Sequence, residues 1–175
     1  MATSTPVAID EYLRVEYDPD VEYVDGELKE RPMVMIEHGA LQSQLSFWFI
    51  SHKKEWKIRV AVEGRVRVSP TRIRLPDVIV GTRGDWPQVL VDPPMIVIEI
   101  LSPSDSFTET LKQINDYLGM GIPNVWIIDP AKRTAFVCRN DAPPDAVTRL
   151  TVEDSPIYVD ITELFAALDE DVREV

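Results

Sequence analysis

Two strand-like runs decide how this chain folds: RIRLPDVIV at residues 72–80 and MIVIEIL at residues 95–101. Aliphatic and β-branched residues dominate both runs and turn-forming residues bound them, which is typical of strands in a buried sheet. Each run carries a carboxylate, and these two, Asp77 and Glu99, are 22 residues apart. A carboxylate is costly to bury unless it is paired, protonated or bound to a cation. The pattern therefore makes a cation site on neighbouring strands the first functional hypothesis.

The composition is that of an ordinary globular protein. The chain has 175 residues, of which 45% are hydrophobic and 27% charged, and this predicts a single domain over residues 1–175. It has no apolar run of the roughly 18–20 residues that a membrane span needs, and its first residues do not resemble a secretory signal. Cys138 is the one cysteine, which excludes an internal disulfide. We therefore expect a cytoplasmic protein that does not bind membranes.

The charge is acidic overall but unevenly distributed. A net charge of −12 argues against loose, non-specific binding of nucleic acid. Residues 53–83 nevertheless hold nine Lys or Arg against three acids, whereas residues 141–175 hold ten acids against two arginines. The basic segment leads into Asp77. Its arginines either follow a phosphate backbone or pair with the acidic tail, and the sequence leaves both interpretations open.

Hydrophobic periodicity predicts a mixed α/β order of elements. In chain order we expect a helix at 8–16 anchored by Leu13, a hairpin turning at Asp25-Gly26, a helix at 37–53, strands at 56–70 and 72–80, a loop at 84–94, a strand at 95–101, a helix at 106–119 capped by Ser104 or Ser106, a strand at 124–130 with its hairpin partner at 133–139, a short strand near 157–159 and a last helix at 161–168.

The helix expected at 37–53 carries the clearest apolar stripe, formed by Leu41, Leu45, Trp48 and Phe49. Glu37 comes one turn before Leu41, which predicts that its carboxylate lies on the same inward stripe, close to the helix N-terminus.

Asp77 and Glu99 supply only oxygen ligands, and these suit a hard cation such as Mg²⁺ or Mn²⁺. An ion held there would activate a water and neutralise charge as a phosphodiester is attacked. A structural interpretation stands beside this one, in which Asp77 is a turn residue after Pro76 and Glu99 pairs with an arginine. Tyr117 is either a core residue or part of the cleft.

The order of the motifs resembles the PD-(D/E)XK nuclease superfamily and, more narrowly, its Uma-two branch of restriction endonucleases. The likeness rests on Pro76-Asp77, 21 intervening residues and Glu99-Ile100-Leu101, then a helix with a lysine and a tyrosine, then GIPNVWIIDP at 121–130. EYVDGEL at 22–28 and the helix with His38 extend it to about two thirds of the chain.

The resemblance implies a restriction-endonuclease-like αβββαβ core with an N-terminal hairpin and a C-terminal extension. It implies Mg²⁺ or Mn²⁺ as cofactor, DNA as substrate and a homodimer for cleavage of both strands. By the same resemblance, Asp77, Glu99 and the main-chain carbonyl of Ile100 are metal ligands. Glu37 matches the acid of the first helix, and His38 falls where the branch carries a histidine.

The expected catalytic lysine is displaced in this chain. Leu101 occupies its usual place in the superfamily, and Gln113 occupies its place in the branch, four residues before Tyr117. Lys112 is the neighbouring residue. At 100° per residue, Lys112 and Gln113 flank the stripe of Phe107, Leu111, Ile114 and Leu118 on opposite sides. Either the helix is turned so that Lys112 reaches the site, or the site lacks its lysine.

Three hypotheses follow. The first is a Mg²⁺-dependent DNA endonuclease in which Asp77 and Glu99 bind metal, Glu37 and His38 assist, and Lys112 supplies the cation. The second is a catalytically degenerate nuclease fold that binds nucleic acid or a protein. The third is a metal-dependent phosphoesterase acting on a small nucleotide.

Overall fold

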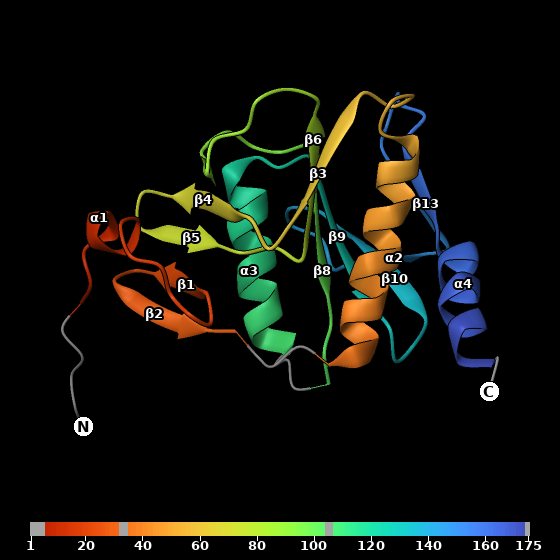
Figure 1. The fold of residues 1–175 in the computed structure, drawn as a ribbon, viewed down its shortest axis with the longest axis horizontal. Helices are drawn as coiled ribbons and strands as arrows, with labels where there is room; N and C mark the ends of the chain where they lie inside the picture. Colours follow the sequence, from red (N-terminus) through yellow and green to blue (C-terminus); the bar gives the residue numbers. More distant parts are fainter. Residues whose placement is uncertain (1–5, 32–34, 104–106, 174–175) are drawn as a thin grey trace.

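The chain folds around a six-stranded mixed sheet with helices on both faces (Figure 1). The structure is a computed structural model that describes residues 6–31, 35–103 and 107–173. In chain order its elements are α1 (Ile9–Tyr12), β1 (Val21–Val24), β2 (Glu27–Glu30), α2 (Ile36–His52), β3 (Ile58–Val62), β4 (Arg65–Ser69), β5 (Arg72–Arg74), β6 (Val78–Thr82), β7 (Val89–Leu90), β8 (Ile96–Ile100), α3 (Phe107–Met120), β9 (Asn124–Asp129), β10 (Thr134–Cys138), β11 (Asp145–Val147), β12 (Arg149–Thr151), β13 (Tyr158–Asp160) and α4 (Ile161–Arg173).

The predicted αβββαβ core is confirmed, and it consists of α2, β3, β6, β8, α3 and β9. The six strands are ordered β11-β10-β9-β8-β6-β3. β6 pairs antiparallel with both β3 and β8, whereas β8 and β9 are parallel because α3 connects them as a crossover helix. The hairpin of β9 and β10 follows as expected.

The two faces of this sheet are covered by different helices. Ile96, Ile98 and Ile100 of β8 lie in a core with residues of α2 and α4. Val97 lies in a second core with Ile114 of α3. Side chains alternate between the faces of a strand, so Glu99 falls on the face that α3 covers.

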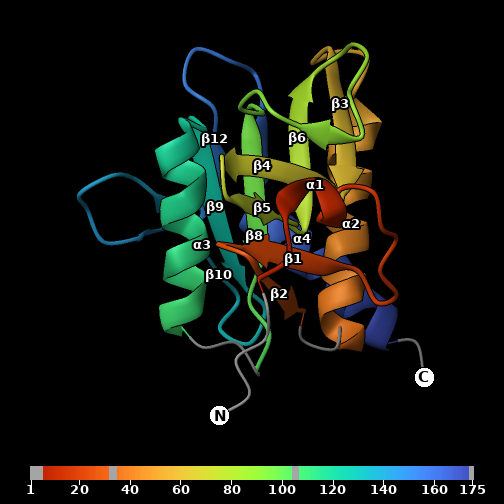
Figure 2. The same cartoon turned by 90° about the vertical axis from the view of Figure 1, so that its left-hand side faces the viewer.

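A second sheet, ordered β2-β1-β5-β4-β7, carries the N-terminal hairpin. Figure 2 shows it crossing in front of the six-stranded sheet, with α3 on one side and α2 on the other. The hairpin turns at Asp25 and Gly26, as predicted, and both residues have positive φ. Positive φ at both central positions is the geometry of a type I′ turn, which matches the twist of the strands.

The predicted strands at 56–70 and 72–80 are each broken in two, which corrects the sequence-based expectation. β3 and β6 belong to the six-stranded sheet, whereas β4 and β5 belong to the five-stranded one. The chain leaves the larger sheet after β3, at Glu63, whose φ is 52°, and returns through Pro76, which has no N–H to offer a sheet. The Glu63 amide donates to the Pro76 carbonyl, so the two crossings lie side by side.

The helices differ from the predictions in extent and rotation. α1 spans only four residues, and its buried residue is Tyr12, not Leu13. The Tyr12 hydroxyl donates to the Val21 carbonyl and anchors the helix on the hairpin. The predicted caps of α3, Ser104 and Ser106, lie outside the described residues. Among the helices that are described, none combines the length and apolar character needed to cross a membrane.

Candidate functional site

Asp77 lies at the point where the chain crosses from the five-stranded sheet to the six-stranded one. It follows Pro76 and immediately precedes β6, so it is held between two sheets and not on a flexible loop. The residue is 2% exposed. A buried carboxylate needs partners, and the three donors to the Asp77 side chain come from three separate parts of the chain.

Three donors surround the Asp77 carboxylate. The Ile100 amide donates to Oδ2 at 2.7 Å, and His38 Nε2 lies 3.2 Å from the same oxygen. Arg31 Nη2 donates to Oδ1 at 2.6 Å. Burial acts to raise the pKa of Asp77, but the contact with His38, the charge of Arg31 and the Ile100 amide outweigh it and lower that pKa. Asp77 is therefore held as an anion.

Glu99 approaches the same region from near the C-terminal end of β8. It is 7% exposed, and its Oε1 accepts a 2.5 Å hydrogen bond from the Tyr117 hydroxyl on α3. Burial and the negative charge of Asp77 raise the pKa of Glu99 well above its usual value, against the opposing effect of Tyr117 and Arg31. The two carboxylates thus repel one another, and a cation between them would relieve that repulsion.

A buried ladder of charges lies beside this pair. Arg74 Nη1 donates to Glu22 Oε2 at 2.6 Å, and Arg74 Nη2 lies 2.7 Å from Asp116 Oδ2. Glu22 Oε1 accepts from the Leu75 amide at 3.2 Å and lies 3.4 Å from Gln113 Nε2. The ladder joins the N-terminal hairpin to β5 and α3, and it places Gln113 toward the site.

Lys112 does not reach the carboxylates in the structure. Its Nζ donates to Glu109 at 2.6 Å, and its side chain is 58% exposed. The inward side of α3 carries Gln113, Ile114 and Tyr117. Of the two arrangements that the sequence allows, the described residues show the one in which no lysine reaches the site.

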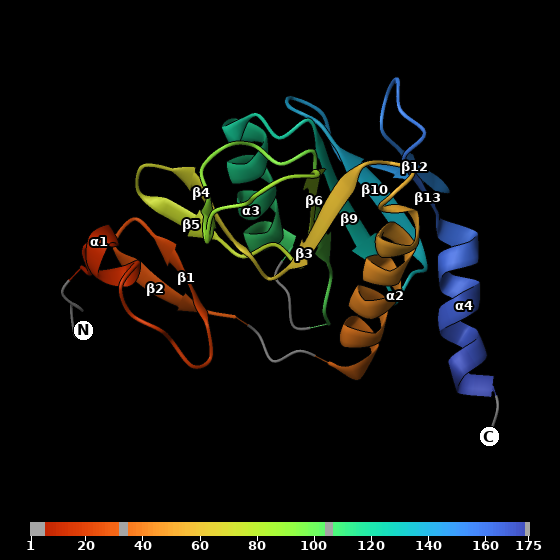
Figure 3. The ribbon, with the colours of Figure 1, turned by 45° about the horizontal axis from the view of Figure 1, so that its top comes forward.

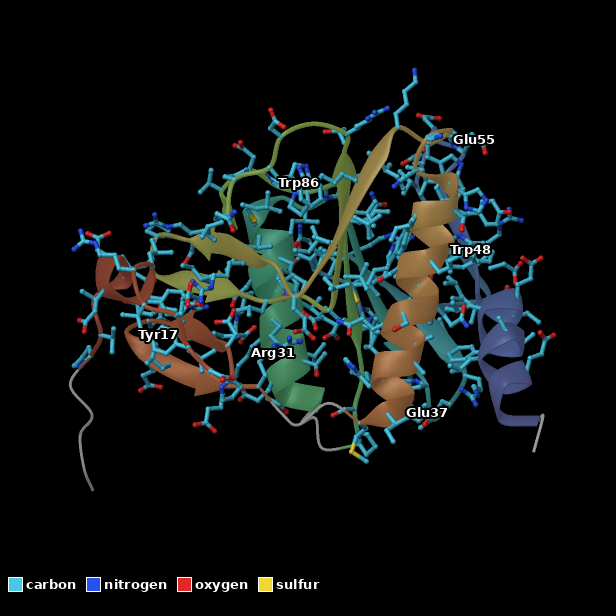
Figure 4. All side chains as sticks on the ribbon, in the orientation of Figure 1. Tyr17, Arg31, Glu37, Trp48, Glu55 and Trp86 are labelled. Atoms are coloured by element: carbon cyan, nitrogen blue, oxygen red, sulfur yellow. The ribbon has the colours of Figure 1, made fainter. Side chains whose placement is uncertain are left out.

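Glu37 is likewise turned away, contrary to the expectation that it shares the inward stripe of α2. Its side chain is 54% exposed and pairs with Arg133 at 3.2 Å. Figure 4 labels Glu37 at the end of α2 where the helix begins, away from Arg31, which contacts Asp77. His38, the next residue, is the one that points inward, because the buried face of α2 runs through His38, Leu41, Leu45 and Phe49.

The donor set fits a hard divalent cation in type and number. The described residues contain no group of three or more His, Cys, Asp or Glu side chains arranged to hold a metal. Mg²⁺, however, is usually bound through one or two carboxylates and keeps several waters. Asp77 and Glu99 meet that requirement. An ion bound there would share Asp77 Oδ1 with Arg31 or displace Arg31 from it.

Sequence reasoning missed Glu22 and Arg31. Glu22 stands between Val21 and Tyr23 in an apolar strand, so the argument used for Glu99 would have identified it too. Arg31 follows β2 in a connecting segment, where no periodic pattern constrains the direction of a side chain. The sequence left open whether Tyr117 is a core residue or part of the site. It is both, since it is fully buried and its hydroxyl also contacts Glu99.

Comparison with known proteins identifies the family of this chain and a similar fold. Residues 9–171 match the model of the Uma2 family, described as "Putative restriction endonuclease". A crystal structure of a "putative nuclease belonging to DUF820" from Anabaena variabilis has a TM-score of 0.81 and 28% identity, over 93% of this chain and 99% of that one. A cryo-EM structure of a DrdV–DNA complex has a TM-score of 0.41 and 18% identity, over 75% of this chain and 11% of that one. No curated protein matches the sequence. Because the family model covers nearly the whole chain, this protein belongs to the Uma2 family.

Proposed function

We propose that the protein is a divalent-metal-dependent nuclease that hydrolyses phosphodiester bonds in DNA. The observation that carries the proposal is the buried pair of carboxylates in the αβββαβ core, with Asp77 at the crossing between the two sheets and Glu99 on β8. Membership of the Uma2 family supports it. Asp77 and Glu99, together with the carbonyl of Ile100, would hold Mg²⁺ or Mn²⁺, which when bound activates water and neutralises phosphate charge.

The surrounding residues have distinct roles in this proposal. His38 and the Ile100 amide orient Asp77 and keep it ionised. The Tyr117 hydroxyl fixes Glu99. Arg31 is the cation nearest to the carboxylates, and its side chain is 21% exposed, so its guanidinium reaches both Asp77 and solvent. We assign to Arg31 the stabilisation of negative charge on the phosphate that the absent lysine would otherwise provide.

The direct test is nicking of supercoiled plasmid by the purified protein with Mg²⁺, with Mn²⁺ and with EDTA. Cleavage in the presence of either ion and its loss in EDTA are expected. Hydrolysis of small nucleotides at a similar rate would instead favour the phosphoesterase hypothesis. Cleavage of both strands needs two sites, so the homodimer stays a prediction, tested by whether linear plasmid forms together with nicked plasmid.

The second candidate function is a nuclease fold that binds nucleic acid or a protein without cleaving. Two observations favour it: Gln113 stands in place of the lysine, and both oxygens of Asp77 already accept bonds from protein donors. This candidate predicts no cleavage by the wild-type protein under any ion. Robust metal-dependent nicking by the wild type would exclude it.

Gln113→Lys is expected to raise the cleavage rate by at least about tenfold, because it restores a cation beside the buried carboxylates. Gln113 Nε2 lies 3.4 Å from Glu22 Oε1, and Tyr117, one turn further along α3, bonds Glu99, so a lysine at position 113 would lie on the side of α3 that faces the carboxylates. Initial rates of plasmid nicking measure the effect. If the wild type is inactive, Gln113→Lys is the variant in which activity should first be detected.

The neighbouring substitution, Lys112→Gln, separates the two arrangements of α3. Because Lys112 makes only an exposed pair with Glu109, its loss should change the rate by no more than about twofold. A tenfold loss in Lys112→Gln with no gain in Gln113→Lys would return the catalytic role to Lys112.

A further inference from the structure

Five cations gather where α2 ends and β3 begins, far from the carboxylate pair. We call this cluster the basic junction; it consists of Lys53, Lys54, Lys57, Arg59 and Arg83, all exposed. The Arg83 amide donates to the Lys57 carbonyl and ties the end of β6 to the turn before β3. Glu55 is the one acid within the turn itself.

The cations of the basic junction have no carboxylate partner among the described residues. Three later arginines of the same basic segment differ: Arg65 pairs with Asp20, and Arg72 and Arg74 pair with Asp116. Arg67, which lies between them, bonds the Pro70 carbonyl. Of the five junction cations, Arg59 bonds the Gly84 carbonyl at 2.9 Å and lies over the Trp86 ring. Five cations without a carboxylate partner, on a protein of net charge −12, make this part of the surface favourable for an anion.

The junction also forms a hollow of about 570 Å³. Its lining includes Lys53, Lys54, Arg59 and Arg83 over the apolar side chains of Ile50 and Val60, and it contains no carboxylate. Three other hollows in the described part of the chain each have two carboxylates in their lining. The hollow at the junction therefore differs in charge from these three.

The basic junction lies at the opposite end of α2 from the site. His38, which contacts Asp77, and Lys53 are fifteen positions apart, or about 22 Å along a helix. Figure 4 shows the two ends of α2, marked by Glu37 and Glu55. β3 starts at the junction and returns toward Asp77 (Figure 3), since Ile58 pairs with Thr82 and Val62 with Val78.

A duplex fits this separation. At about 3.4 Å per base pair, 22 Å corresponds to six or seven base pairs. The basic hollow is therefore placed to contact the backbone a little over half a helical turn from a phosphodiester at Asp77. Fixed cations at such a distance add affinity without reading sequence.

We propose that the basic junction is a second DNA contact, which binds backbone phosphates of a duplex whose scissile bond lies at Asp77 and Glu99. The inference rests on the proposed nuclease function for the identity of the anion. It assigns the junction to affinity and placement of the duplex, and it gives the junction no part in bond cleavage.

The test compares two triple variants with equal changes of charge. Lys53→Gln/Lys54→Gln/Arg83→Gln removes three junction cations. Arg14→Gln/Arg139→Gln/Arg149→Gln removes three exposed cations elsewhere. Binding of a labelled 24-base-pair duplex is measured by fluorescence anisotropy in EDTA over a range of salt concentrations. The junction variant should bind on the order of a hundredfold more weakly at about 0.15 M salt, with the salt slope reduced by about three. The control variant should keep most of the wild-type affinity.

The outcomes separate this inference from the proposed function. Equal losses in the two triple variants, at unchanged melting temperatures, would show a general effect of charge and overturn the inference. Wild-type-like binding by the junction variant, with nicking intact, would overturn it and leave the nuclease proposal standing. The inference is also wrong if the wild type binds no duplex, or if it binds an acidic polypeptide more tightly through the junction. In either case the plasmid assay tests the nuclease proposal separately.

Asp77→Asn should bind the duplex at least as tightly as the wild type.

Discussion

Asp77→Asn is expected to lower metal-dependent DNA cleavage by at least on the order of a hundredfold, because it removes one of the two carboxylates proposed to hold the metal, and a bound metal stabilises several kcal/mol of transition-state charge. The carboxylate of Asp77 is the most tightly held group of the site, with Arg31, His38 and the Ile100 amide all directed at it. Asparagine keeps the shape of the side chain and one acceptor oxygen. It removes the charge by which this position would bind a cation in the proposed site.

The measurement is the initial rate of plasmid nicking at saturating Mg²⁺, with circular dichroism to check the fold. Asp20→Asn is the matched control, since Asp20 also bonds an arginine, at 2.8 Å from Arg65 Nη2, but lies in the N-terminal part of the chain. The control should cleave like the wild type. Unchanged cleavage by a folded Asp77→Asn protein would contradict the assignment of the site to this carboxylate pair.

The sequence could predict the core of the fold because its signals there are local. The turn at Asp25-Gly26, the apolar stripe of α2 and the buried run of β8 each depend on neighbouring residues in the chain, and each formed as predicted. The breaks in the strands at 56–70 and 72–80 were missed because the two-residue alternation continues across them. Only the backbone at Glu63 and the missing amide of Pro76 divert the chain into another sheet.

The sequence predicted Asp77, Glu99 and His38, missed Arg31 and Glu22, and determined the rotation of the two helices only to within one residue. On α2 the predicted His38 contacts Asp77 whereas the predicted Glu37 is turned away, and on α3 Gln113 faces the site in place of Lys112. One position is 100° of rotation, and an apolar stripe does not fix the rotation of a helix that closely. In α3 polar contacts set the rotation of the helix, because Tyr117 bonds Glu99 and Asp116 bonds Arg74 on its inward side.

Arg74→Met is expected to lower the free energy of unfolding by about 3–5 kcal/mol, because it breaks a buried ion pair and leaves one charge uncompensated. Glu22 is the residue left without a cation. It is 4% exposed, and its remaining donors would be the Leu75 amide at 3.2 Å and Gln113 Nε2 at 3.4 Å. Asp116 would keep Arg72 as a partner at 2.7 Å. Methionine retains the unbranched stem of Arg74, so the change measures charge and hydrogen bonding more than volume.

Urea unfolding of the wild type and of four variants, Arg74→Met, Glu22→Gln, Glu22→Gln/Arg74→Met and Arg67→Met, tests this expectation. Arg67→Met is the control, because Arg67 lies on the adjacent strand β4 and makes one hydrogen bond, to the Pro70 carbonyl at 3.1 Å; it should cost no more than about 1 kcal/mol. The loss in the free energy of unfolding of Glu22→Gln/Arg74→Met should be smaller than the sum of the losses in the two single variants, by about 1–3 kcal/mol. The reason is that removing both charges leaves no buried charge without a partner. Equal costs for Arg74→Met and Arg67→Met would mean that the ladder does not hold the hairpin on the core. The hairpin leads directly to Arg31, so a variant that loosens it should also loosen the contact of Arg31 with Asp77.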